Sequence, residues 1–93
     1  MLESVIEMAL TKQVKQMGGK ALKFISPGNT GMPDRLVLLP KGKVGFVEVK
    51  APGKGPSPLQ LARHEVLKNL GFQVHVLDDC NQIEEILNAI QSA

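Results

Sequence analysis

Two segments rich in proline and glycine constrain the fold of this chain more than any other feature. Residues 26–33 contain two prolines and two glycines, and residues 51–58 contain three prolines and two glycines. Such segments form loops, because proline lacks a backbone N–H and both residues interrupt regular structure. Between them lie two apolar runs, 35–39 and 44–50, joined by the turn sequence PKGK at 40–43. The pattern predicts a β-hairpin bounded by two loops.

Helical signals flank this hairpin on both sides. Apolar residues recur at helical spacing over residues 2–17, and the glycine pair 18–19 ends that segment. Ser57 followed by Pro58 is typical of a helix N-cap and first turn, so a second helix should run to about Leu70. This helix should pack through an apolar face made of Leu59, Ala62, Val66, Leu67 and Leu70.

The remaining segments complete the order of elements. Residues 20–25 and 72–77 are predicted to be short strands, and residues 82–91 a final helix. The second helix connects the hairpin to the last strand, so those two strands should be parallel. The predicted order α-β-β-β-α-β-α indicates an α/β fold with a mixed sheet flanked by helices, in one domain spanning residues 1–93.

Composition narrows the class of protein. Apolar residues make up 43% of the chain and charged residues 22%, which is typical of a globular protein. No apolar run approaches the roughly 18 residues that cross a bilayer, and the acidic N-terminus does not resemble a signal peptide, so no membrane partner is expected. The single cysteine, Cys80, excludes an internal disulfide and a multi-thiolate zinc site and favours the cytoplasm. Three phenylalanines without Trp or Tyr argue against a single-strand binder that stacks bases.

Positive charge is concentrated in the middle of the chain. Residues 11–64 carry ten basic and two acidic residues, a net charge of +8, whereas residues 65–93 sum to −4. A basic region of this kind suits a polyanion such as nucleic acid. A solvated surface explains the same distribution equally well, so charge alone leaves both interpretations open.

Three polar residues stand out within the hairpin. Glu48 and Lys50 lie two apart in the second strand, so their side chains leave the same face of the sheet. Asp34 opens the first strand, and the hairpin can bring it beside them. Two carboxylates held close repel each other unless a cation lies between them, and their oxygens suit Mg²⁺ or Mn²⁺. With a lysine to orient or deprotonate water, the set suits phosphodiester hydrolysis, although a solvent-exposed Glu–Lys pair is a competing interpretation.

The same residues carry a family resemblance. The stretch Gly31-Met32-Pro33-Asp34-Arg35, an apolar strand, a turn and then Val47-Glu48-Val49-Lys50 resemble the PD-(D/E)xK nuclease signature. More narrowly, they resemble the VRR-NUC family, the virus-type replication-repair nucleases. The flanking residues 26–28 and 51–53, together with Gln60, extend the similarity over nearly the whole chain. The resemblance implies a restriction-endonuclease-like core and a Mg²⁺- or Mn²⁺-dependent endonuclease.

The resemblance also implies the ligands of the metal. Asp34 and Glu48 correspond to the metal-binding carboxylates of the family. The backbone carbonyl of Val49 corresponds to a third protein ligand. Lys50 corresponds to the catalytic lysine. In this interpretation, the three polar residues of the hairpin form one active site.

Two further positions follow from the same resemblance. Gln60 corresponds to a glutamine at the edge of the active site, with a supporting role. A glutamate on the first helix of the family also approaches the metal. Glu7 is the choice for it, because of its spacing to the glycines that end the helix, and Glu3 is the alternative one turn away.

The resemblance further implies a DNA substrate and a homodimer. Stand-alone members of this size resemble phage and bacterial enzymes that act as homodimers on branched DNA such as Holliday junctions. Basic side chains would contact phosphates and set position rather than sequence. The candidates are Lys23, Arg35, Lys54 and Arg63. Neither loop fits a nucleotide-phosphate motif, so no nucleotide cofactor is expected.

The other chemistry-bearing residues are predicted to be structural. His64 on the second helix and His75 in the last strand are expected on the surface, and Cys80 is expected to be a buried or idle thiol.

Two alternatives to an endonuclease stay open at this point. One is a non-catalytic DNA-binding module with a nuclease-like fold, and the other is a small structural protein whose strand charges are incidental.

Overall fold

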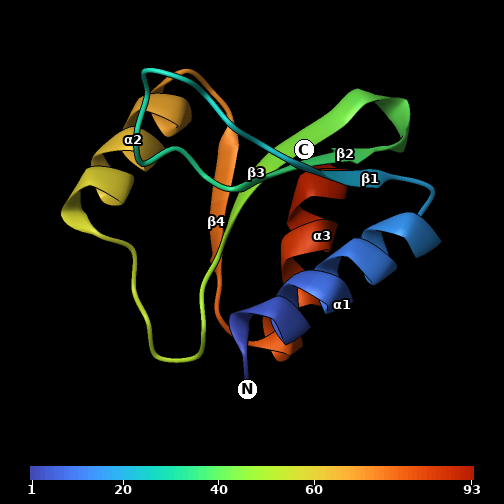
Figure 1. Cartoon of the computed structure of the whole chain (residues 1–93). Helices are drawn as coiled ribbons and strands as arrows, with labels where there is room; N and C mark the ends of the chain where they lie inside the picture. Colours follow the sequence, from blue (N-terminus) through green and yellow to red (C-terminus); the bar gives the residue numbers. More distant parts are fainter.

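The computed structural model describes residues 1–93 and contains one mixed four-stranded sheet flanked by three α-helices (Figure 1). The strands lie side by side in the order β1-β2-β3-β4. The elements are α1 (Glu3–Gln16), β1 (Lys20–Lys23), β2 (Arg35–Leu39), β3 (Lys43–Val49), α2 (Pro58–Asn69), β4 (Gln73–Leu77) and α3 (Ile83–Ser92). The predicted order α-β-β-β-α-β-α and the α/β fold class are confirmed.

The hairpin of β2 and β3 forms the centre of the sheet. The two strands are antiparallel, with Arg35 opposite Val47. A short 3-10 turn joins them, in which Lys41 and Gly42 adopt positive φ values of 69° and 73°. β1 pairs with β2 in the antiparallel sense, and β4 pairs with β3 in the parallel sense after the α2 crossover. Turn chemistry therefore fixes the register of the central strands.

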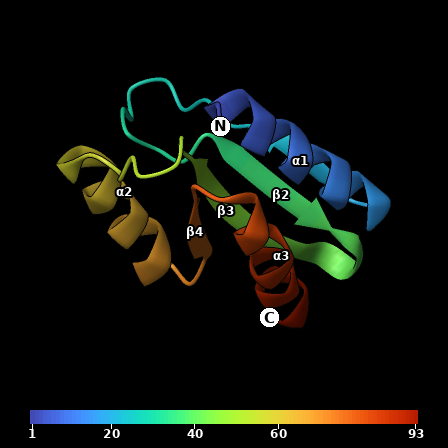
Figure 2. The same cartoon turned by 90° about the horizontal axis from the view of Figure 1, so that it is seen from below.

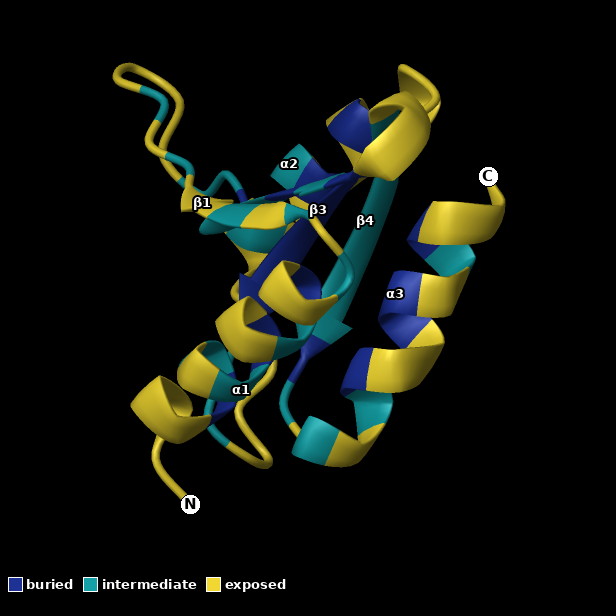
Figure 3. Ribbon diagram, turned by 90° about the vertical axis from the view of Figure 1, so that its right-hand side faces the viewer, coloured by how far each residue is buried: buried dark blue, intermediate teal, exposed yellow.

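One face of the sheet is covered by α1 and α3, which enclose the hydrophobic core (Figure 2). Twelve buried apolar residues form this core, contributed by both helices and by β2, β3 and β4. Gly45 lets α3 approach β3 closely, because a Cβ atom there would lie 2.5 Å from Ile90 Cδ1. The buried side of α3 faces the sheet and its exposed side faces outward (Figure 3). This face is closed and apolar.

The opposite face of the sheet is covered by α2 (Figure 2). The residues that α2 buries there differ from the predicted ones. The buried residues of α2 are His64 and Leu67. Most of the predicted apolar face is wrong, since four of its members are exposed: Leu59, Ala62, Val66 and Leu70. The physical reason is that the sheet beneath α2 includes the buried carboxylate of Glu48, so a polar side chain takes an inward position.

The turn before α3 contacts the N-terminus of the chain. Cys80 is half-buried and lies in a short 3-10 turn that precedes α3, with its Sγ 3.8 Å from Met1 Sδ.

No helix of the structure combines the length and the apolar character needed to cross a membrane.

Candidate active site

Asp34 lies immediately before β2, directly after the first proline- and glycine-rich loop. Its Oδ1 accepts a hydrogen bond of 3.1 Å from the backbone N–H of Val49, and its own carbonyl oxygen accepts one of 2.9 Å from the N–H of Phe24. Burial raises the pKa of Asp34; the Val49 hydrogen bond opposes this rise, and the negative charges of Glu7 and Glu3 add to it. The carboxylate is thus held by backbone from a neighbouring strand.

Glu48 lies near the end of β3 and is only 3% exposed. Burial raises the pKa of its carboxyl to about 7; the negative charge of Asp34 adds to this rise and the positive charge of Lys50 opposes it. The Oε1 atom is enclosed and has no hydrogen-bond partner. The competing interpretation of an exposed Glu–Lys pair is therefore wrong for Glu48. A buried oxygen without a hydrogen-bond partner raises the free energy of the folded chain.

The hairpin register brings the two carboxylates to the same end of the two central strands, β2 and β3. Because Arg35 lies opposite Val47, the next step along the two strands sets Asp34 beside Glu48. Val47 and Val49 belong to the core under α1 and α3, so the Glu48 side chain between them leaves the other face. No three side chains of His, Cys, Asp or Glu gather into a metal-binding group. The side-chain part of the site is a carboxylate pair.

Lys50 follows β3 at the same edge. Its backbone N–H donates a hydrogen bond of 2.8 Å to the carbonyl oxygen of Leu77, which fixes it beside the end of β4. Its side chain is half-buried and makes no ion pair. The positive charge lowers the pKa of both Glu48 and His64, so Lys50 acts on the same small region.

His64 is the residue that sequence reasoning missed. It was expected on the surface, yet it is 2% exposed, and its Nε2 lies 3.5 Å from Glu48 Oε1 with no hydrogen-bond partner. Burial lowers the pKa of the imidazole, and the positive charges of Lys68 and Lys50 lower it further. One signal was available: His64 lies one turn after Gln60 on the same side of α2, so a helix with Gln60 at the site also brings His64 there.

The chain is similar to known proteins over almost its whole length. No family model matches it. A protein named "Putative nuclease p44", from Acyrthosiphon pisum secondary endosymbiont phage 1, is 52% identical over 88 residues, which cover 95% of this chain and 94% of that protein. A solved structure described as a VRR_NUC domain has a TM-score of 0.86 and 32% identity, covering 92% of this chain and 94% of that one. The chain belongs to the VRR-NUC family. The family predicted from the hairpin motif is therefore confirmed.

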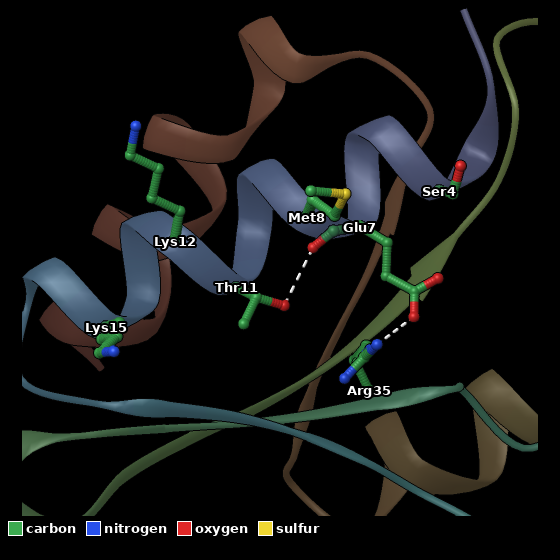
Figure 4. Close-up of a pocket in the computed structure, with 7 residues that line it drawn as sticks. All are labelled: Ser4, Glu7, Met8, Thr11, Lys12, Lys15 and Arg35. Carbon is green, nitrogen blue, oxygen red and sulfur yellow. Dashed lines mark hydrogen bonds and ion pairs between the residues drawn. The ribbon is translucent and has the colours of Figure 1, made fainter.

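The two acids on α1 of this VRR-NUC chain occupy different surroundings. The carboxylate of Glu7 pairs with the guanidinium of Arg35 (Figure 4). The same guanidinium donates a hydrogen bond of 3.1 Å to the carbonyl oxygen of Ala21. Glu3 is exposed and makes no ion pair. Both negative charges raise the pKa of Asp34, but only that of Glu3 also raises the pKa of Glu48. Glu7 is therefore held by a cation of its own, whereas Glu3 is free.

The largest hollow of this VRR-NUC chain lies beside α1 and not at the carboxylate pair. It has a volume of about 500 Å³ and is lined by α1 and Arg35 (Figure 4). Only Glu7 and Arg35 connect it to the candidate site. The carboxylate pair itself lies at one end of the two central strands, and neither of its residues lines this hollow.

The expected phosphate-binding residues lie around the site in two kinds of setting. Lys23 and Lys54 are exposed, at the end of β1 and in the second loop. Arg35 and Arg63 are engaged within the chain: Arg35 with Glu7, and Arg63 through a hydrogen bond of 2.9 Å from its Nε to the carbonyl of Thr30. The two lysines are thus free for an external partner, while the two arginines hold the fold around the site.

Gln60 has a defined structural role at the start of α2. Its side-chain Oε1 accepts a hydrogen bond of 2.8 Å from Ser57 N–H, and its own N–H donates one of 3.1 Å to Ser57 Oγ. This reciprocal capping box fixes the first turn of the helix. The Ser57–Pro58 start predicted for this helix is present.

Proposed function

We propose that this chain is a metal-dependent nuclease that hydrolyses phosphodiester bonds in DNA. The observation that carries the proposal is the carboxylate pair of Asp34 and Glu48, which the hairpin register sets side by side and in which the charge of Asp34 raises the pKa of Glu48. The phage relative that is named as a nuclease supports the same chemistry.

The donor atoms of the pair suit a hard divalent cation. The negative charge of Asp34 raises the pKa of Glu48, a repulsion that a cation between them relieves. The N–H of Val49 points toward Asp34, and in a strand the carbonyl of the same residue points to the same side, so it can add a third oxygen. We propose that Asp34, Glu48 and the Val49 carbonyl hold Mg²⁺ or Mn²⁺. Such a cation, when bound, stabilises charge on phosphate and acidifies water.

The chain's own residues supply the remaining chemistry. The Lys50 ammonium is proposed to hold the attacking water in line or to accept its proton, and to stabilise charge that builds on the phosphate. Its place beside Glu48 supports this role. Lys23 and Lys54 are proposed to contact phosphates outside the site, with Arg35 and Arg63 contributing through the guanidinium nitrogens that their internal bonds leave free.

The acid on α1 and the glutamine on α2 complete the proposed site. Glu7 is proposed to support the metal from α1, with Glu3 as the alternative; the charges of both reach Asp34. Gln60 is proposed to support the edge of the site through its side-chain N–H groups, because its oxygen is used by the helix cap.

Branched DNA and a homodimer are the finer parts of the proposal. Two copies would present two active sites to two strands of a junction. Apolar side chains that are exposed on α1 and α2, or at their capping residues, provide apolar surface of the kind that contacts a second copy. These residues are Leu2, Val5, Met8, Leu59, Leu61, Val66 and Leu70.

The direct test is cleavage of a fluorescent four-way junction and of a matched duplex, with Mg²⁺ or Mn²⁺. Glu48→Gln and Lys50→Ala should each lower the single-turnover rate by about 100-fold or more. Glu84→Gln, an exposed acid on α3, is the matched control and should leave the rate unchanged. Equal rates in the wild type and both site variants would refute the proposal. Salt-sensitive DNA binding without cleavage under any metal would support the non-catalytic DNA-binding module instead.

A further inference from the structure

The contact between α2 and β3 is made by two buried polar atoms that lack partners. Glu48 Oε1 and His64 Nε2 face each other at 3.5 Å, and they are the only buried side-chain nitrogen or oxygen atoms of the chain without a hydrogen bond. This distance is longer than a normal N–H···O hydrogen bond of about 2.7–3.2 Å. Leaving two such atoms unpaired destabilises the folded chain, and an apolar residue at position 64 would avoid part of that loss.

The position of the imidazole is fixed by the anchoring of α2. The capping box of Ser57 and Gln60 sets the start of the helix. One turn on, Arg63 donates a hydrogen bond to the carbonyl of Thr30 and ties the helix to the first loop. On the inner side, Leu67 packs beside His64 at 6% exposure. The position of the His64 imidazole over Glu48 is therefore set by the contacts that anchor α2.

The two oxygens of Glu48 lie in different surroundings. Oε1 is enclosed against α2, whereas Oε2 is not among the enclosed atoms without a partner. A donor on Oε1 would fix the rotation of the carboxylate and leave Oε2 for the side where Asp34 lies. Donors behind a carboxylate ligand commonly set its orientation, and their loss costs about 10- to 100-fold in metal affinity. Loose contacts in free enzymes often tighten when the site is filled.

We infer that His64 is a positioning residue for Glu48: its Nε2–H donates to Oε1 and turns Oε2 toward the Asp34 edge of the site. The inference rests on the proposed function, because the orientation matters only if Glu48 holds a cation. It adds a residue from α2 to a site otherwise built from the hairpin and α1.

The experiment compares two variants of His64 with a matched histidine control. His64→Leu keeps apolar packing and removes the donor, and His64→Gln keeps an N–H near the same position. His75→Gln is the control, since His75 is half-buried on β4 and bonds Gln73 at 2.8 Å instead. Mn²⁺ affinity is measured by calorimetry on the full chain without DNA, together with unfolding by urea. Long-range ¹H–¹⁵N spectra of the metal-free wild type report which imidazole nitrogen carries the proton.

The expected result separates positioning from packing. His64→Leu should weaken Mn²⁺ binding about 10- to 100-fold while its resistance to urea is unchanged or greater, and His64→Gln should stay within about threefold of the wild type. His75→Gln should not change Mn²⁺ binding, and the spectra should show the proton on Nε2 of His64. Normal Mn²⁺ binding by His64→Leu, or a proton on Nδ1 with Nε2 bare, would overturn the inference alone. A wild type that neither binds Mn²⁺ nor cuts DNA would overturn the proposed function and the inference together.

Discussion

The two faces of the sheet are built in opposite ways. The face under α1 and α3 buries twelve apolar residues and no charged group. The face under α2 buries Glu48 and His64, each with an unpartnered polar atom. The first arrangement lowers the free energy of the folded chain, and the second raises it. The comparison indicates that the apolar face supplies the stability that allows the other face to hold a poorly solvated carboxylate.

Deleting a core side chain should have the largest effect on stability. Leu87, on α3, is 1% exposed, so Leu87→Ala should lower the free energy of unfolding by about 2–5 kcal/mol. Urea denaturation of the metal-free chain measures it. The control is Leu61→Ala on α2, where the side chain is 51% exposed and the change should stay within about 0.5 kcal/mol. Similar losses of stability in both variants would contradict the claim that the face under α1 and α3 supplies most of the stability.

Removing the buried carboxyl of Glu48 should raise the free energy of unfolding, whereas deleting a core side chain lowers it. The pKa of Glu48 is raised from 4.5 to about 7 by folding, so the folded metal-free chain retains a proton there that the unfolded chain has lost. That difference makes stability fall as pH rises from about 4.5 to 7 and level off above. Glu48→Gln should flatten this part of the profile and stabilise the chain at pH 8 by about 1–3 kcal/mol. Urea titrations at several pH values test it, and a less stable variant at pH 8 would show that Glu48 is not under electrostatic stress.

The smallest effect is expected at the start of α2. Ser57→Ala removes one half of the capping box with Gln60 and should cost about 1 kcal/mol of stability. The control is Ser92→Ala at the exposed end of α3, where the hydroxyl only bonds the carbonyl of Asn88 and the change should be near zero. Thermal unfolding compares the two. Equal losses would show that the polar cap is not what supports the α2 face.

Local signals made most of the fold predictable. The bounds of β2 match the predicted run 35–39 because a proline- and glycine-rich loop and a PKGK turn enclose it. Hairpin geometry also anticipates that Asp34 lies near Glu48, since antiparallel pairing follows from the turn. The first strand was predicted two residues too long, because its pairing with β2 continues only through the single bond from Phe24 to Asp34.

The packing of α2 could not be predicted from periodicity. An apolar stripe indicates the buried side of a helix only when the surface beneath it is apolar. Beneath α2 lies a carboxylate, so a histidine is buried and Val66, which the pattern favoured, is 52% exposed. The choice between the two acids on α1 could not be made from sequence either, because Glu3 and Glu7 share a helix face and their surroundings, including the ion pair of Glu7 with Arg35, are set by the fold.

The bond from Val49 N–H to Asp34 Oδ1 has a consequence for the folding chain. If β2 slid by one residue along β3, Asp34 would change sides of the sheet and part from Glu48. In a mispaired molecule, the proposed carboxylate pair would therefore not form. Under the proposed activity, such a molecule would not cut DNA until its strand register is corrected.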